Sequence, residues 1–160
     1  GIKGMQASLE NMVSGMRQEQ MVGGANLVGK KVVIEGGSFI GGNGGESSGT
    51  VNLPQSADSV SFSIYNTQTG ELVYSETSSD IDAGSRDLEW NGRGSQGELV
   101  PYGSYAMTAS ANIDGKFTPL QVTTTAEVKS VKWNPQLQQL SLEIGNGVYI
   151  PLAAVERISN

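Results

Sequence analysis

The sequence predicts a mainly β protein whose central part is a sandwich of the immunoglobulin or fibronectin-III type. Apolar residues alternate with polar ones over short stretches, as at Val60, Phe62 and Ile64, which is the period of a half-buried strand. Turn-forming dipeptides such as Asn91-Gly92 and Asp114-Gly115 separate these stretches about every eight to twelve residues. Glycine supplies 22 of the 160 residues and charged residues only 16%, a composition that favours turns and strands over helices.

Composition also excludes several classes of function. The chain contains neither cysteine nor histidine, which excludes disulfide bonds, thiol or imidazole nucleophiles and the zinc sites built from those ligands. The formal net charge of −6 argues against nucleic acid or an anionic membrane as a partner, because both need a basic surface. Lys30-Lys31 is the single adjacent basic pair, and we interpret it as a solvated strand edge. No apolar run approaches the roughly 18 residues of a membrane span.

Residues 1–24 contain the one predicted helix. Its apolar residues recur at spacings of three and four, and Gly4 and Gly15 weaken it, so it needs a partner surface. That surface is either the chain's own β-domain or a second copy of the chain. Because the first residue is glycine, we also expect a further N-terminal segment upstream. In the second case the helix is an assembly leg, and its oligomerisation contacts are Ile2, Met5, Leu9, Met12 and Met16.

A compact apolar strand is predicted over residues 27–35, centred on Val32, Val33 and Ile34. Residues 36–49 follow, and they include seven glycines. A phosphate-binding loop is excluded here, because no Gly-Lys-Ser/Thr element and no helical pattern follow. We therefore predict a mobile linker or hairpin tip over residues 36–49.

The predicted sandwich runs over residues 50–118. Leu88 and Trp90 alternate along one strand, and Tyr105 and Met107 along the next. Trp90 and Tyr105 are predicted to be the largest core side chains. Asp80-x-Asp82 has the spacing of half a calcium loop but lacks its further oxygen ligands, so a turn is predicted.

Residues 119–160 are predicted to form a separate unit of three or four strands. The alternation over residues 122–128 changes phase before Trp133, which indicates a bulge near Lys129-Ser130. These strands are too few to close a small barrel. The economical arrangement pairs them with the strand at 27–35, with the sandwich inserted between the two parts.

No catalytic site emerges from the pattern of residues. Glu127 and Glu143 lie on strands whose outward side chains are polar in any case, and Glu89 points away from the apolar face of its strand. Phe39, Trp133 and Tyr149 are the aromatic residues available for a methyl-lysine cage, but core packing is the favoured interpretation. The sequence predicts no catalytic, cofactor-binding or metal site.

One sequence motif resembles that of a known family. It comprises Trp90-Asn91-Gly92, then Gly97, then Pro101-Tyr102-Gly103-Ser104-Tyr105. Residues 27–32 and 147–158 also resemble strands that flank this motif in the same family. The chain is similar in these respects to the flagellar hook-capping protein family, also called the basal-body rod modification protein family. The resemblance covers most of the 160 residues.

The resemblance implies a fold and a function. The fold would be a split Tudor-like β-barrel over residues 25–49 and 119–160, with an immunoglobulin-like insert at 50–118. The protein would be a non-enzymatic scaffold, exported through the flagellar type III secretion channel. It would form a homo-oligomeric ring at the tip of the growing hook and assist polymerisation of hook protein, with no cofactor. The alternative is a bacterial surface or adhesion module that binds a saccharide, for which Tyr65 is the clearest exposed aromatic candidate.

Overall fold

A computed structural model describes Gly4 and residues 21–159 of the chain. The five predicted oligomerisation residues of the N-terminal helix, Ile2, Met5, Leu9, Met12 and Met16, lie outside the described residues. Within them, residues 21–25 are helical and lead through turns into the first strand. The mainly β prediction is confirmed, since strands follow one another over almost all of the remaining chain.

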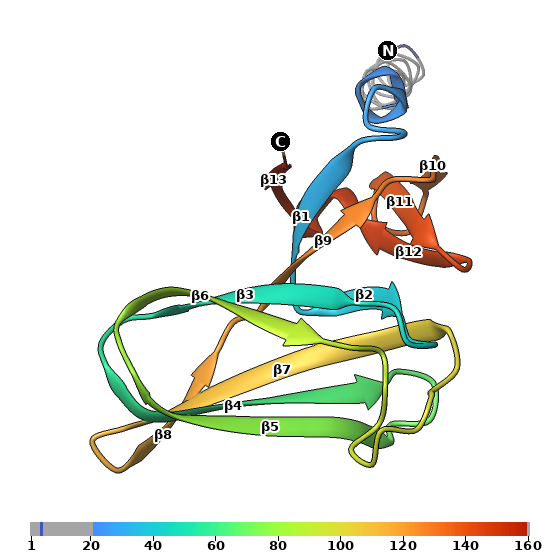
Figure 1. Ribbon diagram of the computed structural model, residues 1–160. Helices are drawn as coiled ribbons and strands as arrows, with labels where there is room; N and C mark the ends of the chain where they lie inside the picture. The colour runs from blue at the N-terminus through green and yellow to red at the C-terminus, as the bar shows by residue number, and fades with distance from the viewer. Residues whose placement is uncertain (1–3, 5–20, 160) are drawn as a thin grey trace.

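The strands, with one short 3-10 helix, follow in the order shown in Figure 1. They are β1 (Lys31–Glu35), β2 (Ser38–Gly41), β3 (Ser47–Leu53), β4 (Ala57–Asn66), β5 (Leu72–Ile81), β6 (Gly84–Trp90), β7 (Gly103–Ile113), β8 (Lys116–Leu120), β9 (Thr123–Glu127), β10 (Ser130–Asn134), β11 (Gln139–Gly145), β12 (Val148–Pro151), η1 (Leu152–Ala154) and β13 (Val155–Ile158).

The lower part of Figure 1 is a two-layer sandwich. One layer has the strand order β2-β7-β4-β5, with β8 also paired to β7, and the other contains the pair β3-β6. All of these pairings are antiparallel. The predicted alternation is confirmed in β4, where Val60, Phe62 and Ile64 are buried between the layers. The sandwich core is completed mainly by aromatic and aliphatic residues of β2, β3, β6 and β7, namely Phe39, Val51, Leu88, Trp90, Tyr105 and Met107.

A second, smaller unit lies at one end of the sandwich. It contains β10, β11 and β12, which form one antiparallel sheet, together with β1, β13 and part of β9. Strand β1 pairs with β9 on one side and β13 on the other, as expected for a strand at 27–35 that joins the C-terminal residues. Its core is separate from that of the sandwich and consists of Val32, Ile34, Val128, Leu142, Ile144 and Ile150.

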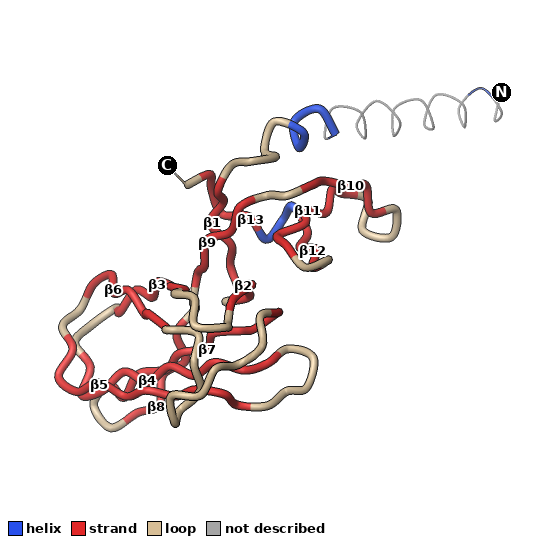
Figure 2. The backbone as a smooth tube through the Cα atoms, turned by 45° about the vertical axis from the view of Figure 1, so that its right-hand side comes forward, coloured by secondary structure: helices blue, strands red, loops and turns tan. Residues whose placement is uncertain are grey.

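Strand β9 belongs to both units. It pairs along its length with β1, and its residues Thr123 and Thr124 also pair with Thr50 and Gly49 of β3. A single five-stranded sheet therefore runs from one unit into the other, in the order β13-β1-β9-β3-β6. Figures 1 and 2 both show β1 and β9 side by side as the ribbon that leads from the smaller unit to the sandwich.

Of the two alternatives predicted for residues 36–49, the mobile linker is wrong, and a hairpin-like tip is limited to the turn that the antiparallel bridge between Gly42 and Gly45 closes. Residues 38–41 form β2, paired with β7, and residues 47–53 form β3, paired with β6. The glycines of this stretch serve tight turns instead: Gly36, Gly37, Gly42 and Gly44 all have positive φ, a conformation that favours glycine. Phe39 is buried in the sandwich core, so this stretch packs against the sandwich, which a solvated linker would not do.

The phase change expected near Lys129-Ser130 corresponds to a break between two strands. Strand β9 ends at Glu127 and β10 begins at Ser130. Between them the backbone N–H of Val128 donates to the carbonyl of Lys30, and that of Lys129 donates to the carbonyl of Glu143. The chain thus changes pairing partner at this point, from β1 to β11.

Candidate functional site

The motif residues lie at the end of the sandwich where β6 ends and β7 begins. Trp90 and Tyr105 are 1% exposed, and their ring centroids are 5.1 Å apart in an edge-to-face arrangement. Phe39 contacts both, at 5.8 Å from Trp90 and 6.1 Å from Tyr105. Aromatic rings at these separations attract one another in addition to burying apolar area. The motif therefore begins and ends in one aromatic cluster.

The polar atoms of the two large rings fix the loop between them. The indole nitrogen of Trp90 donates a hydrogen bond to the carbonyl of Arg93 over 2.8 Å. The hydroxyl of Tyr105 donates to the carbonyl of Pro101, four residues upstream, as in the tyrosine corner of immunoglobulin-like folds. Burial raises the pKa of the Tyr105 hydroxyl, so it stays protonated as a donor. Both ends of the loop over residues 91–102, hereafter the motif loop, are thus held from inside the core.

The motif glycines allow two loops to approach closely. Gly92 has φ 72°, and a Cβ at this position would lie 2.6 Å from the carbonyl oxygen of Gly45. Its own carbonyl accepts a hydrogen bond from Gly44 N–H over 3.1 Å. Gly97 has φ 81° and lies in open space, so it serves the turn alone. Asn91 closes the first turn, because its side-chain oxygen accepts from the Arg93 N–H over 3.1 Å.

Through these contacts the motif residues pack and hydrogen-bond within the sandwich itself. The motif loop presents two large exposed apolar side chains, Leu99 and Tyr102. At its end Gly103 pairs with Gly41 of β2 and faces Asn146 in the β11–β12 turn of the smaller unit. The motif loop therefore lies near the junction of the two units.

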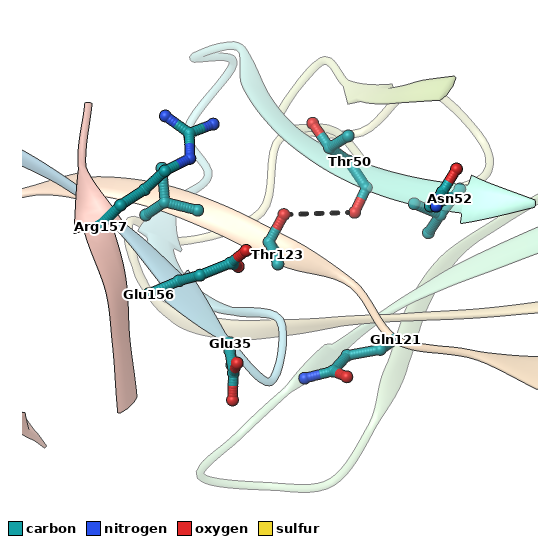
Figure 3. A pocket seen from close by; sticks show the side chains of 9 residues that line it. Glu35, Thr50, Asn52, Gln121, Thr123, Glu156 and Arg157 are labelled. Atoms are coloured by element: carbon teal, nitrogen blue, oxygen red, sulfur yellow. Dashed lines mark hydrogen bonds between the residues drawn. The ribbon is translucent and has the colours of Figure 1, made fainter. Parts of the chain in front are cut away.

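A polar groove lies at the same junction, on the outer face of the shared sheet (Figure 3). Its volume is about 370 Å³, and it is open to solvent. Residues from both units line it: Val33, Glu35, Glu156 and Arg157 from β1 and β13, and Thr50, Val51, Asn52, Gln121 and Thr123 from β3, the β8–β9 connection and β9. The Thr123 hydroxyl donates to the Thr50 carbonyl over 3.4 Å, beside the β3–β9 pairing.

The chemistry of this groove suits recognition of a polar surface. Its side chains include two carboxylates, a guanidinium, two amides and two hydroxyls. Arg157 can bind a carboxylate or a backbone carbonyl with several N–H groups at once, while Glu35 and Glu156 can accept from cationic or amide donors. Sequence reasoning missed this groove. Its residues are far apart in the chain, and only the pairing of β1 with β13 and of β3 with β9 brings them together.

The carboxylates considered from the sequence are not gathered around a reactive group. Glu89 is exposed and lines a hollow of about 220 Å³ with Glu46 and Glu76. Tyr74 lies in the same hollow, where burial and then the charge of Glu76 raise its pKa. Among the described residues no group of three or more acidic, histidine or cysteine side chains could hold a metal ion.

The three aromatic residues considered for a cage do not meet. Phe39 is buried in the sandwich core. Trp133 and Tyr149 lie in the smaller unit, on β10 and β12, the two outer strands of the three-stranded sheet. The ammonium group of Lys132 lies 4.0 Å from the centre of the Tyr149 ring, so this ring makes an intramolecular cation–π contact. The packing interpretation of Phe39 is therefore the correct one.

Comparisons with known proteins identify the family. A family model described as the FlgD Ig-like domain matches residues 37–115. The crystal structure of FlgD from P. aeruginosa is 30% identical, with a TM-score of 0.70, and the match covers 83% of this chain and 98% of that one. The chain belongs to the FlgD family. The resemblance drawn from the motif residues is thereby confirmed.

Other FlgD proteins match over a similar extent. The crystal structure of FlgD from Xanthomonas campestris, described as giving insights into the hook capping essential for flagellar assembly, is 28% identical with a TM-score of 0.70. The match covers 88% of this chain and 99% of that one. The basal-body rod modification protein FlgD of Escherichia coli is 28% identical over 122 residues, which are 72% of this chain and 52% of the relative. The chain thus spans about half the length of the curated relatives it matches.

The family match also bears on the start of the sandwich. It begins at residue 37, next to β2 and well before residue 50, where the sequence placed the boundary. This agrees with the pairing of β2 and β3 inside the sandwich. In the part of the chain that the structure describes, no helix has the length and apolar character needed to cross a bilayer.

Proposed function

We propose that this FlgD-family chain is a non-enzymatic scaffold that caps the tip of the growing flagellar hook and assists polymerisation of hook protein. One observation carries the proposal: this chain covers 99% of the Xanthomonas campestris FlgD chain, whose structure is described as giving insights into hook capping in flagellar assembly. The comparisons do not favour the saccharide-binding alternative. Tyr65, on which that alternative relied, is only half-exposed on β4.

The proposed cap is a homo-oligomeric ring outside the cell. Its subunits would arrive there by export through the flagellar secretion channel. Residues 1–24 would act as its legs, with contacts at Ile2, Met5, Leu9, Met12 and Met16. The β-domains would form its plate. The sequence assigns residues 25–49 and 119–160 to a Tudor-like barrel split by the sandwich, and we keep that description for the smaller unit. Strands β2, β3 and β8 pair within the sandwich and are assigned to it instead. The smaller unit has a core of its own, while Phe39 and Val122 pack in the core of the sandwich.

Within this role we assign contact with hook protein to the junction groove. Residues of both units line the groove, so a bound segment would contact both units at once. Its donors and acceptors of both charge signs suit a polypeptide surface, and its open, polar character suits a contact that forms and is released. No cofactor is needed for such binding.

A complementation experiment tests the role of the whole protein. The full-length gene that encodes this chain is expressed in its own flagellated host lacking FlgD, and hooks are counted by electron microscopy. Restored hooks and swimming are expected. A strain that exports the folded protein yet forms no hooks would contradict the capping role.

A binding experiment tests the groove separately. Purified hook protein is titrated against the chain and against the Glu156→Lys, Arg157→Glu double variant, which keeps the net charge. We expect at least a tenfold weaker affinity for the double variant. The matched control exchanges Lys129 and Glu127, an exposed ion pair at 3.3 Å on the smaller unit, to Glu and Lys. Equal affinities for all three proteins would place the contact elsewhere.

A further inference from the structure

The outer face of the β7-β4-β5 sheet carries hydroxyl and amide groups and no charged side chain in its central rows. Val60, Phe62 and Ile64 of β4 point into the core, so the alternating residues of that strand point outward. Strand register places the residues of β5 and β7 beside them on the same side. The resulting face, hereafter the hydroxyl face, consists of Ser59, Ser61, Ser63, Ser75, Thr77, Ser79, Thr108, Ser110 and Asn112.

The hydroxyl groups of this face partly satisfy one another. Ser61 and Thr77 share a hydrogen bond of 2.8 Å, and Ser63 and Ser75 share one of 3.3 Å. A hydroxyl that already has a partner loses less when water is removed from it. Serine and threonine also lose little side-chain entropy on contact, in contrast to the lysine and glutamate of ordinary surfaces. The free-energy cost of removing water from the hydroxyl face is therefore low.

An apolar projection and a hollow adjoin each other on this face. Phe117 of β8 pairs with Asn112 of β7 and is 77% exposed, the largest exposure among the large apolar side chains of the described residues. Phe117 forms one wall of a hollow of about 260 Å³, which Ser59, Ser61, Ser110 and Gly115 also line. The volume is sufficient for an aromatic ring. Projection and recess are thus present together on a single copy of the chain.

We propose that the hydroxyl face binds the same face of a second copy of this chain, with Phe117 of each copy in the hollow of the other. Two arguments select this occupant. A two-fold contact pairs the same surface patch of both copies, so that patch must be complementary to itself. A projecting side chain next to a recess meets this requirement. In addition, two copies with a net charge of −6 repel each other, and an uncharged face is where that repulsion is least. The contact is independent of the proposed cap function and of the N-terminal helix.

The test is sedimentation of the full chain over a concentration series. To remove any association through the helix, all proteins carry Leu9→Asp and Met12→Asp. We expect a monomer–dimer equilibrium that shifts toward dimer as salt rises, because salt screens the repulsion between the acidic copies. Phe117→Ser is expected to weaken dimerisation at least tenfold. The matched control Tyr102→Ser, which removes an exposed aromatic at the motif loop, is expected to leave it unchanged.

A second measurement locates the contact even if Phe117→Ser is poorly folded. The chain has no cysteine, so Asn112→Cys introduces a single thiol on the hydroxyl face, and Gln68→Cys introduces one in the β4–β5 turn. Mild oxidation should give a covalent dimer of the Asn112 variant at least ten times faster than of the Gln68 variant. A monomer at all concentrations, or equal cross-linking of the two variants, overturns the proposal. Loss of hook-protein binding in Phe117→Ser, with no dimer of the parent, would assign the face to the hook protein instead.

Discussion

The hydroxyl of Thr124 in β9 donates a hydrogen bond to the backbone carbonyl of Ser38 in β2 over 2.6 Å. Thr124 is 2% exposed, so this bond is shielded from water. It adds a direct contact between β9, which belongs to both units, and a strand of the other sandwich layer. A second bond, from Gly36 N–H to the Val122 carbonyl over 3.1 Å, lies close by in the chain. The junction of the two units is therefore hydrogen-bonded across the sandwich and not only along the shared sheet.

Replacing this threonine should weaken the junction. Thr124→Val keeps the shape of the side chain but removes the donor, and we expect a loss of about 1–2 kcal/mol in the free energy of unfolding. Urea denaturation followed by circular dichroism measures it. Thr125→Val is the matched control, because Thr125 is exposed on the same strand and should change stability by less than about 0.5 kcal/mol. Equal losses in both variants would show that the Thr124 bond contributes nothing specific.

Removing the large ring of the aromatic cluster should affect the sandwich first. Trp90→Ala is expected to destabilise the sandwich by about 3–5 kcal/mol, because it leaves a cavity among Phe39, Tyr105 and their neighbours. The smaller unit should survive, since its core does not include Trp90. The chain has two tryptophans, so in this variant the fluorescence of Trp133 reports on the smaller unit alone.

The denaturant profile of Trp90→Ala separates two views of the junction. Independent units predict two transitions in far-ultraviolet circular dichroism, with the Trp133 signal changing only in the second, at the higher denaturant concentration. A single transition seen by both probes would contradict independence. It would mean that the β3–β9 pairing and the Thr124 bond make the two units one cooperative body.

The hydroxyl of Tyr105 should matter most at high pH. Burial raises the folded pKa of this group above its ordinary value of about 10. Its contribution to stability is therefore complete below the unfolded pKa and is lost as pH rises through the folded pKa. Tyr105→Phe should cost about 0.5–1.5 kcal/mol at neutral pH, because the Pro101 carbonyl loses its donor.

Two measurements check the Tyr105 prediction. Thermal unfolding between pH 7 and pH 11 should show a smaller loss of stability with rising pH in Tyr105→Phe than in the parent chain. Hydrogen exchange at neutral pH should become faster over the motif loop, residues 91–102. Tyr102→Phe, at an exposed position, is the control and should change neither quantity. Parallel pH profiles for Tyr105→Phe and the parent would contradict the assignment.

The predicted N-terminal helix offers a test of ring assembly. If Ile2, Met5, Leu9, Met12 and Met16 form an oligomerisation seam, each fully enclosed side chain contributes about 1.5–3 kcal/mol. Association itself costs several kcal/mol, about 4 or more, so the assembly should be weak and reversible. Leu9→Asp with Met12→Asp should abolish assembly of the ring while leaving the β-domains folded. Sedimentation and circular dichroism of the two proteins decide it, and unchanged ring assembly would place the legs elsewhere.

The strands could be predicted from the sequence because their signal is local. In β4 the alternation of Val60, Phe62 and Ile64 with serines is itself the two-faced pattern of a sheet above a core. The same reasoning left two alternatives for residues 36–49, a mobile linker or a hairpin tip, and the mobile linker is wrong. Glycine is compatible both with disorder and with a tight turn that needs positive φ, and composition alone does not distinguish the two.

The junction groove could not be predicted, because its residues share no local pattern. Glu35 and Arg157 lie at opposite ends of the sequence and come together only through the pairing of β1 with β13. The hydroxyl face was only partly visible. The alternation in β4 predicts that its polar residues face away from the core, but their neighbours on β5 and β7 follow from strand register, and register depends on the whole sheet.

The bond between Gly36 and Val122 places the points where the chain enters and leaves the sandwich next to each other. A domain attached in this way is an insertion that could be exchanged for another while the smaller unit stays the same. A longer or shorter domain could be inserted between these two residues, and the smaller unit would keep its own core. The length of the protein measured from the smaller unit can then change in evolution without a change in the smaller unit.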